Sequence, residues 1–219
     1  MSAIEELRET MARLRAPGGC PWDIEQTHQS LCDNLIEEAA ELLETIDRGD
    51  FDHMREELGD VLLQVVFHSQ MAAEAGHFNF DDVAAEINEK LVRRHPHVFG
   101  DMDLEDSQAV LKEWEAIKAK EKKNGPKQMG VLKDLPQSLN AILTAREILK
   151  QIAKKSLQSS YVEEKIIEEK SEQLTEEKVG EELFNWIGAA RVAGIDPESA
   201  LRRYCLKVSD EIEAQKRRA

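Results

Sequence analysis

Two short acidic segments carry the residues of this chain that are best suited to metal chemistry. The first contains Glu38 and Glu41, and the second contains Glu57 and Asp60. Because residues three apart share one face of an α-helix, each segment would present a pair of carboxylates. Both pairs stand among apolar residues, where the carboxylates would repel one another and resist loss of water unless a cation joined them. This spacing predicts a metal site inside a helical bundle.

The ligand types indicate which metal such a site would take. Carboxylate oxygens are hard ligands and suit Mg²⁺ or Mn²⁺ rather than zinc. The three cysteines, at positions 20, 32 and 205, lack the paired spacing of a zinc site or a disulfide framework. Glu37 precedes Glu38 directly and lies about 100° from it around the helix. From there its carboxylate could act as a base that orients a water molecule.

Composition favours an all-α protein. Of the 219 residues, 41% are hydrophobic and only 5% are aromatic, and Ala, Leu, Glu and Lys are abundant, which favours helix over sheet. The net charge of −15 argues against a nucleic-acid partner and against an anionic membrane. The N-terminus lacks the pattern of a signal peptide, and no apolar run is long enough to cross a bilayer. We therefore expect a cytoplasmic protein.

Cap and stop residues divide the chain into helices. Asp50 and either Asn79 or Asp81 can begin helices, Gly49 can end one, and Pro96 disfavours helix at the residue before it. The expected helices cover residues of about 2–14, 23–47, 50–76, 79–94 and 107–123, with a last one from Pro197.

A faint internal repeat predicts two related helical-bundle modules. The segment 56–63, Glu-Glu-Leu-Gly-Asp-Val-Leu-Leu, has an echo at 177–184, Glu-Lys-Val-Gly-Glu-Glu-Leu-Phe. The sequence Asn-Gly-Pro at 124–126 is the clearest linker. The expected parts are a first module over residues 1–123, which carries both acidic segments, a linker over 124–135 and a degenerate second module over 136–219.

The second module lacks the acidic set. The repeat aligns Lys178 with Glu57. It also aligns Glu181 with Asp60. A lysine at a ligand position would repel Mg²⁺, so we expect metal only in the first module.

Six short strings follow one another in the first module. They are Cys20-Pro-Trp-Asp23 with Gln26-Thr27, Glu37-Glu38-x-x-Glu41, Glu56-Glu-Leu-Gly-Asp60, Gln64-Val-Val-Phe-His68, Lys90-Leu-Val-Arg-Arg-His-Pro-His-Val-Phe99 and Trp114-Glu-Ala-Ile-Lys118. In this order they resemble the MazG-type nucleoside triphosphate pyrophosphohydrolases of the all-α NTP pyrophosphatase superfamily. The string Arg-Arg-His-Pro-His-Val-Phe is the most specific of them.

The resemblance implies an enzyme that hydrolyses (deoxy)nucleoside triphosphates to a nucleoside monophosphate and pyrophosphate, in nucleotide-pool housekeeping. Carried over by position, the metal ligands would be Glu38, Glu41, Glu57 and Asp60, and these with Glu37 would form the catalytic set. The metal would be Mg²⁺, with Mn²⁺ as a substitute. Bundles of this family commonly complete their core and active site across a dimer, so a homodimer is expected.

The substrate residues also follow from the resemblance. Lys90 and Arg94 are four apart and so share one helix face, from which they would contact the triphosphate. Trp114 and Lys118 resemble the family's C-terminal nucleotide-contacting pair. These residues would supply the positive and aromatic groups that an acidic chain needs to hold a nucleotide.

Other interpretations of the same residues stay open. An acidic cluster on a helix is usually a solvated face, Lys90 and Arg94 could complement a helix C-terminus, and Trp114 could be a packing anchor. The chain as a whole could be a non-catalytic helical interaction protein that retains a vestigial metal site. A di-iron bundle is a third alternative, because Glu25-x-x-His28 and Glu74-x-x-His77 have the spacing of its ligands.

Overall fold

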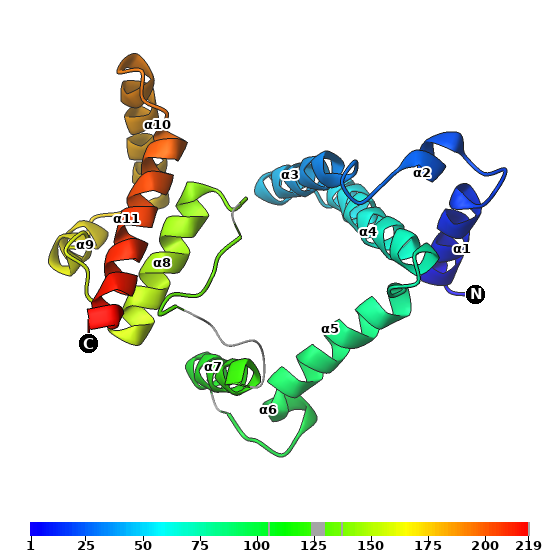
Figure 1. Cartoon of the computed structure of the whole chain (residues 1–219), viewed down its shortest axis with the longest axis horizontal. Coiled ribbons are helices and arrows are strands. Elements are labelled where there is room, and N and C mark those ends of the chain that lie inside the picture. The colour runs from blue at the N-terminus through cyan, green and yellow to red at the C-terminus, as the bar shows by residue number, and fades with distance from the viewer. Residues whose placement is uncertain (105, 124–129, 137, 219) are drawn as a thin grey trace. The chain divides into compact units, whose positions relative to one another are not determined.

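The computed structural model describes residues 1–104, 106–123, 130–136 and 138–218. The regular elements in those residues are all helices, so the prediction of an all-α protein is confirmed. They are α1 (Ala3–Arg15), α2 (Pro21–Glu25), α3 (Cys32–Arg48), α4 (Phe51–Glu74), α5 (Phe80–Arg94), α6 (Pro96–Phe99), α7 (Ser107–Lys123), α8 (Ala141–Lys155), α9 (Glu164–Ser171), α10 (Glu176–Val192) and α11 (Pro197–Arg218) (Figure 1). None of these helices is both long and apolar enough to cross a membrane.

The chain divides into two compact units, Met1–Lys120 and Glu121–Ala219. The first six residues of the predicted linker, 124–129, lie outside the described residues. The structure places residues 130–135, also expected in the linker, within the second unit, where Leu132 is 7% exposed and lies in the core. An apolar side chain that docks between helices removes this segment from the linker.

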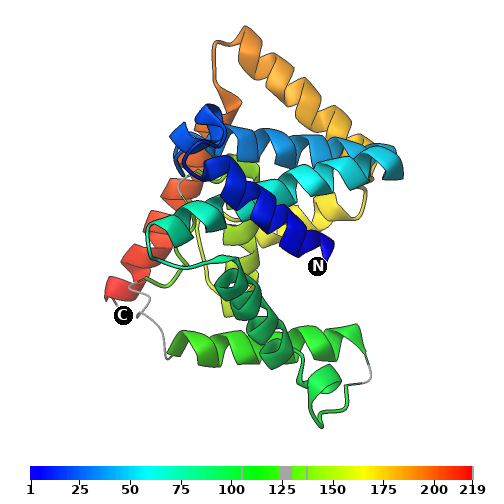
Figure 2. The ribbon, with the colours of Figure 1, turned by 90° about the vertical axis from the view of Figure 1, so that its right-hand side faces the viewer.

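The first unit is built on an antiparallel pair of helices, α3 and α4, and α1 packs against α4 (Figure 2). This packing buries a cluster that consists of Met11, Leu31, Val66, Phe67 and Met71. This core lies beside the C-terminal half of α4. The N-terminal half of α4, which carries the second acidic segment, lies outside it.

Several predicted boundaries are confirmed. The turn between α3 and α4 uses Gly49 at φ 65°, a left-handed conformation that glycine adopts without steric cost. The Asp50 side chain then accepts a hydrogen bond from the His53 backbone N–H at 3.2 Å. Asn79 forms a capping box at the start of α5, and α5 ends at Arg94.

The expected continuous helix over 23–47 is wrong, because the chain leaves helical geometry between α2 and α3. There the Thr27 backbone N–H donates to Ser30 Oγ at 2.9 Å, and the Ser30 backbone N–H donates to Thr27 Oγ1 at 3.1 Å. Hydroxyl side chains that bind backbone groups in this way compete with the helical ladder. The break therefore lets α3 begin in a new direction.

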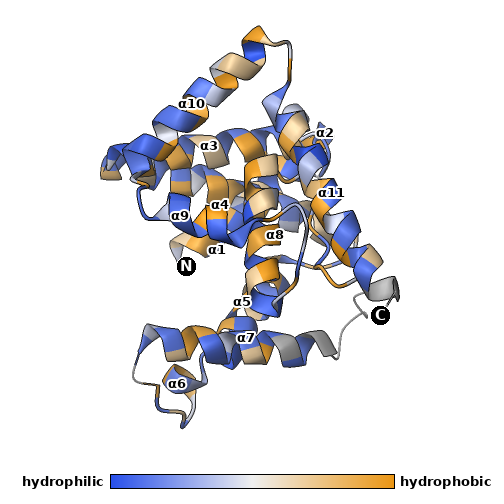
Figure 3. Ribbon diagram, turned by 90° about the vertical axis from the view of Figure 1, so that its left-hand side faces the viewer, coloured by the Kyte–Doolittle hydropathy of each residue, from blue (hydrophilic) through white to orange (hydrophobic). Residues whose placement is uncertain are grey.

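Many apolar side chains of the α3–α4 pair remain exposed in the single chain. Figure 3 shows hydrophobic residues along both helices. They include Leu35, Ile36, Leu43, Ile46, Leu58, Leu62 and Val65, with exposed fractions from 38% to 68%. The core thus covers only one side of the pair.

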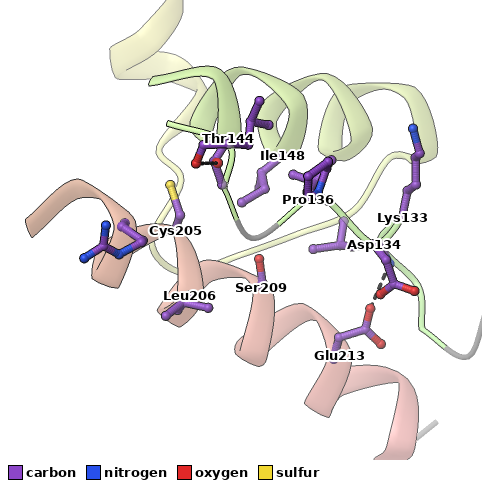
Figure 4. A pocket seen from close by; sticks show the side chains of 13 residues that line it. Lys133, Asp134, Pro136, Thr144, Ile148, Cys205, Leu206, Ser209 and Glu213 are labelled. Carbon is purple, nitrogen blue, oxygen red and sulfur yellow. Dashed lines mark hydrogen bonds between the residues drawn. The ribbon is translucent and has the colours of Figure 1, made fainter. Parts of the chain in front are cut away.

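The second unit packs α8 against α11. Its core contains Leu132, Ile148, Ile152, Cys205, Val208 and Ile212. Beside it lies a pocket of about 480 Å³, bounded by α8, α11 and the segment that precedes α8 (Figure 4). On one side of this pocket Glu213 Oε1 accepts a hydrogen bond from the Leu132 backbone N–H at 2.7 Å.

Candidate metal centre

The α3–α4 pair brings three of the predicted metal ligands together. One carboxylate oxygen each from Glu38, Glu41 and Glu57 lie within 4.8 Å of one another, and we call these three residues the acidic cluster. The two glutamates of α3 share a face because they are three apart. The turn at Gly49 reverses the chain so that Glu57 of α4 meets that face.

Asp60, the fourth predicted ligand, lies beside the acidic cluster. Burial raises the pKa of Glu38, and the negative charges of Asp60, Glu41 and Glu37 raise it further. Burial also raises the pKa of Glu57, and the negative charges of Glu41 and Asp60 raise it further. The four carboxylates therefore destabilise one another when all are ionised and no cation lies between them.

This donor set fits a hard divalent cation. The oxygens of the acidic cluster come from two helices, so each side chain can turn toward a common point. A cation there would offset both the burial and the repulsion that raise the pKa values of Glu38 and Glu57. Glu37 is exposed on the adjacent face of α3. The assignment of these residues as ligands and base stays a prediction that the geometry favours.

Of the predicted substrate residues, three converge on one another. The Arg94 guanidinium lies 5.8 Å from the centre of the Trp114 ring, and Lys118 Nζ lies 4.1 Å from it. Both distances are typical of cation–π contacts. Lys90 is half-buried one turn before Arg94 on α5. Trp114 Nε1 is buried and has no hydrogen-bond partner in the described part of the chain.

The structure does not bring these cationic residues to the acidic cluster within one chain. Glu57 and Asp60 lie in the N-terminal half of α4, whereas Lys90 and Arg94 lie at the C-terminal end of α5. That end of α5 lies away from the start of α4 in two perpendicular views (Figures 1 and 2). One chain therefore presents two half-sites, one anionic and one cationic.

Two polar features on or beside α4 were not predicted from the sequence as parts of a site. His28 Nδ1 lies 2.7 Å from His68 Nδ1, and the two rings are stacked with centres 5.0 Å apart. His68 is half-buried. Gln64 is 6% exposed, and its Oε1 has no hydrogen-bond partner among the described residues.

Comparisons of the sequence with known proteins identify its family. The family model described as "MazG nucleotide pyrophosphohydrolase domain" matches residues 26–99. The "Nucleoside triphosphate pyrophosphohydrolase/pyrophosphatase MazG" of Thermotoga maritima is 45% identical over 208 residues, which cover 91% of this chain and 80% of that protein. The chain belongs to the MazG family. The "Nucleoside triphosphate pyrophosphohydrolase" of Escherichia coli K12 is 42% identical over 219 residues, which cover 93% of this chain and 83% of that protein.

The span matched by the MazG family model contains both acidic pairs, Lys90 and Arg94. It ends before Trp114 and Lys118. Among solved structures, the MazG-related protein from Thermotoga maritima aligns with a TM-score of 0.46 and 23% identity, over 52% of this chain and 98% of that one.

Proposed function

We propose that this chain hydrolyses nucleoside triphosphates to a nucleoside monophosphate and pyrophosphate, with Mg²⁺ or Mn²⁺ held in its first unit. The acidic cluster carries this proposal, because its three carboxylate oxygens converge within 4.8 Å. The names of the Thermotoga maritima and Escherichia coli relatives, which the chain matches over most of its length, support the reaction. Such a reaction fits housekeeping of the nucleotide pool in the cytoplasm.

The chain's own residues have separate tasks in this reaction. Glu38, Glu41, Glu57 and Asp60 would hold the cation, which supplies a Lewis acid and lowers the pKa of a bound water. Lys90 and Arg94 would bind phosphate oxygens, and the planar guanidinium of Arg94 suits two oxygens of one phosphate. Glu37 would accept the proton of the attacking water. Trp114 and Lys118 would contact the nucleoside.

We further propose that a homodimer completes the site. Within one chain the acidic cluster and the Arg94–Trp114–Lys118 group lie apart, although both must reach one triphosphate. The α3–α4 pair also exposes a row of large apolar side chains, which a monomer rarely leaves in water. A second copy that packs against this row would cover it and bring the cationic half-site of one chain to the anionic half-site of the other.

Product analysis tests the reaction directly. The full chain is incubated with Mg²⁺ and a panel of NTPs and dNTPs, and the products are separated by ion-exchange chromatography. Pyrophosphate and monophosphate in equal amounts are expected, whereas diphosphate with inorganic phosphate, or no product, would contradict the proposal. Arg94→Ala should lower kcat/KM for dATP strongly, because it removes a charge that faces phosphate. Arg93→Ala, an exposed arginine one position earlier, is the matched control.

The second unit is proposed to be structural. Lys178 stands where the repeat places Glu57 in the first unit, and a lysine there would repel a cation. Because the second unit is proposed to hold no metal, Lys178→Glu in the full chain should leave pyrophosphate release unchanged. A change in kcat/KM of more than a few-fold for that variant would move part of the activity to the second unit.

A further inference from the structure

The unpartnered carbonyl of Gln64 lies on the face of α4 that carries the acidic residues. At 100° per residue, Glu57, Asp60, Gln64 and His68 point within about 80° of one another around the helix. Gln64 stands one turn beyond Asp60, about 6 Å along the axis. It is 6% exposed. The polar face of α4 thus continues past the predicted ligands into the buried part of the helix.

Gln64 lies between the acidic cluster and the apolar core along α4. Glu57, before it on the helix, belongs to the acidic cluster, and Phe67, after it, belongs to the core. The buried carbonyl of Gln64 therefore stands next to the predicted metal ligands and not deep within the apolar core.

A buried carbonyl oxygen without a donor is unfavourable, and native proteins rarely leave one unpaired. Gln64 Oε1 has no partner among the described residues. Its neighbours Val66 and Phe67 are buried and apolar, so an apolar residue would suit this position if it only had to pack. The geometry therefore indicates that a donor arrives with a ligand.

We propose that Gln64 Oε1 accepts a hydrogen bond from the 3′-hydroxyl of the bound nucleotide. This inference rests on the proposed function, which places the phosphates at the acidic cluster. One helical turn from Asp60 matches the reach from the α-phosphate to the 3′-hydroxyl, whereas the amino groups of a base lie farther out. The 3′-hydroxyl is also a donor that every ribonucleotide and deoxyribonucleotide carries. Gln64 would then fix the sugar and with it the position of the α-phosphate at the metal.

The test compares nucleotides that differ only in this hydroxyl. Binding of dAMP and of 2′,3′-dideoxy-AMP in the presence of Mg²⁺ is measured by calorimetry, and pyrophosphate release is measured from dATP and 2′,3′-dideoxy-ATP. A site that hydrogen-bonds a substrate hydroxyl rejects the analogue that lacks it. The wild-type chain should therefore prefer the 3′-hydroxyl nucleotide by about 10-fold or more in both measurements.

The variant Gln64→Met keeps the length of the side chain and removes the acceptor. It should bind dAMP as weakly as the wild-type chain binds 2′,3′-dideoxy-AMP, and its preference should fall to about 1-fold. Gln70→Met is the matched control, because Gln70 Nε2 donates to Glu74 Oε1 at 3.0 Å on the same helix. This control should keep the wild-type preference.

Two results would overturn the proposal. One is a wild-type chain that binds both monophosphates equally, and the other is a Gln64→Met variant that keeps the preference. If that variant also changes the ratio of dAMP binding to dIMP binding, the carbonyl is assigned to a base amino group instead. If the wild-type chain releases no pyrophosphate, the proposed function fails, and the binding comparison still decides the role of Gln64.

Discussion

The variant Glu57→Lys copies into the first unit the residue that the repeat places in the second. It replaces a carboxylate of the acidic cluster by an ammonium within about 5 Å of Glu38 and Glu41. The formal charge of the cluster changes from −3 to −1, since one negative charge is lost and one positive charge is gained (−3 + 1 + 1). We expect the fold to remain, because the introduced ammonium would lie between two carboxylates that otherwise repel each other.

The expected loss of metal affinity is large. Changing a residue that only orients a ligand typically costs 10–100-fold in affinity, so replacing a ligand carboxylate by a cation should cost more than about 100-fold for Mn²⁺. Without metal, the variant should be at least as stable as the wild-type chain, because it removes the Glu57 carboxylate, whose pKa is raised by burial and by the charges of Glu41 and Asp60. Mn²⁺ should raise the unfolding temperature of the wild-type chain and leave that of the variant unchanged.

Calorimetric titration with Mn²⁺ and thermal unfolding in EDTA measure the two effects separately. Glu56→Lys is the matched control, since it makes the same charge change at an exposed position next to the acidic cluster. It should lower Mn²⁺ affinity only slightly. The assignment of the metal to this cluster is refuted if Glu57→Lys binds Mn²⁺ within about 10-fold of the wild-type chain, or if both variants lose the same amount.

Three further predictions concern stability. Glu213→Ala should lower the free energy of unfolding of the second unit by about 1–3 kcal/mol, because the Leu132 N–H loses a charged acceptor; urea denaturation measures this, and Glu213→Gln should lose less. The raised pKa values of Glu38 and Glu57 mean that the folded state binds more protons, so in EDTA their contribution to stability should increase as pH falls from neutral toward 4.5. If the urea midpoint of the wild-type chain changes with pH in the same way as that of the Glu38→Gln variant, this prediction is contradicted. Burial and the nearby imidazole of His28 lower the pKa of His68, so its contribution should be lost as pH falls below 6.5, and His68→Asn should flatten that part of the urea-midpoint profile.

The helical class and the convergence of the acidic residues could be predicted from local sequence patterns. The i,i+3 spacing of each acidic pair, the left-handed stop at Gly49 and the side-chain cap at Asp50 act within a few residues, so they can be identified without a structure. They also determine that α3 and α4 run antiparallel. The convergence of Glu41 and Glu57 is a direct consequence.

The features that escaped prediction depend on contacts between segments that are distant in the sequence. In the sequence, Leu132 looks like part of a linker. Only the fold shows that it lies in the core of the second unit and that its backbone N–H donates to Glu213, 81 residues away. Gln64 looks like an ordinary polar residue on a helix, because only packing shows that its side chain is buried without a donor. The separation of Arg94 from the acidic cluster likewise follows from the direction in which α5 leaves α4.

The four carboxylates all lie on one helical hairpin, which affects how such a group of residues can evolve. All four carboxylates lie between positions 38 and 60, a stretch of 23 residues that forms one hairpin with a short turn. Such a segment closes a small loop and can assemble early, before distant parts of the chain are in place. It can therefore be duplicated or transplanted as one unit, because its four carboxylates need no partner from elsewhere in the chain to come together.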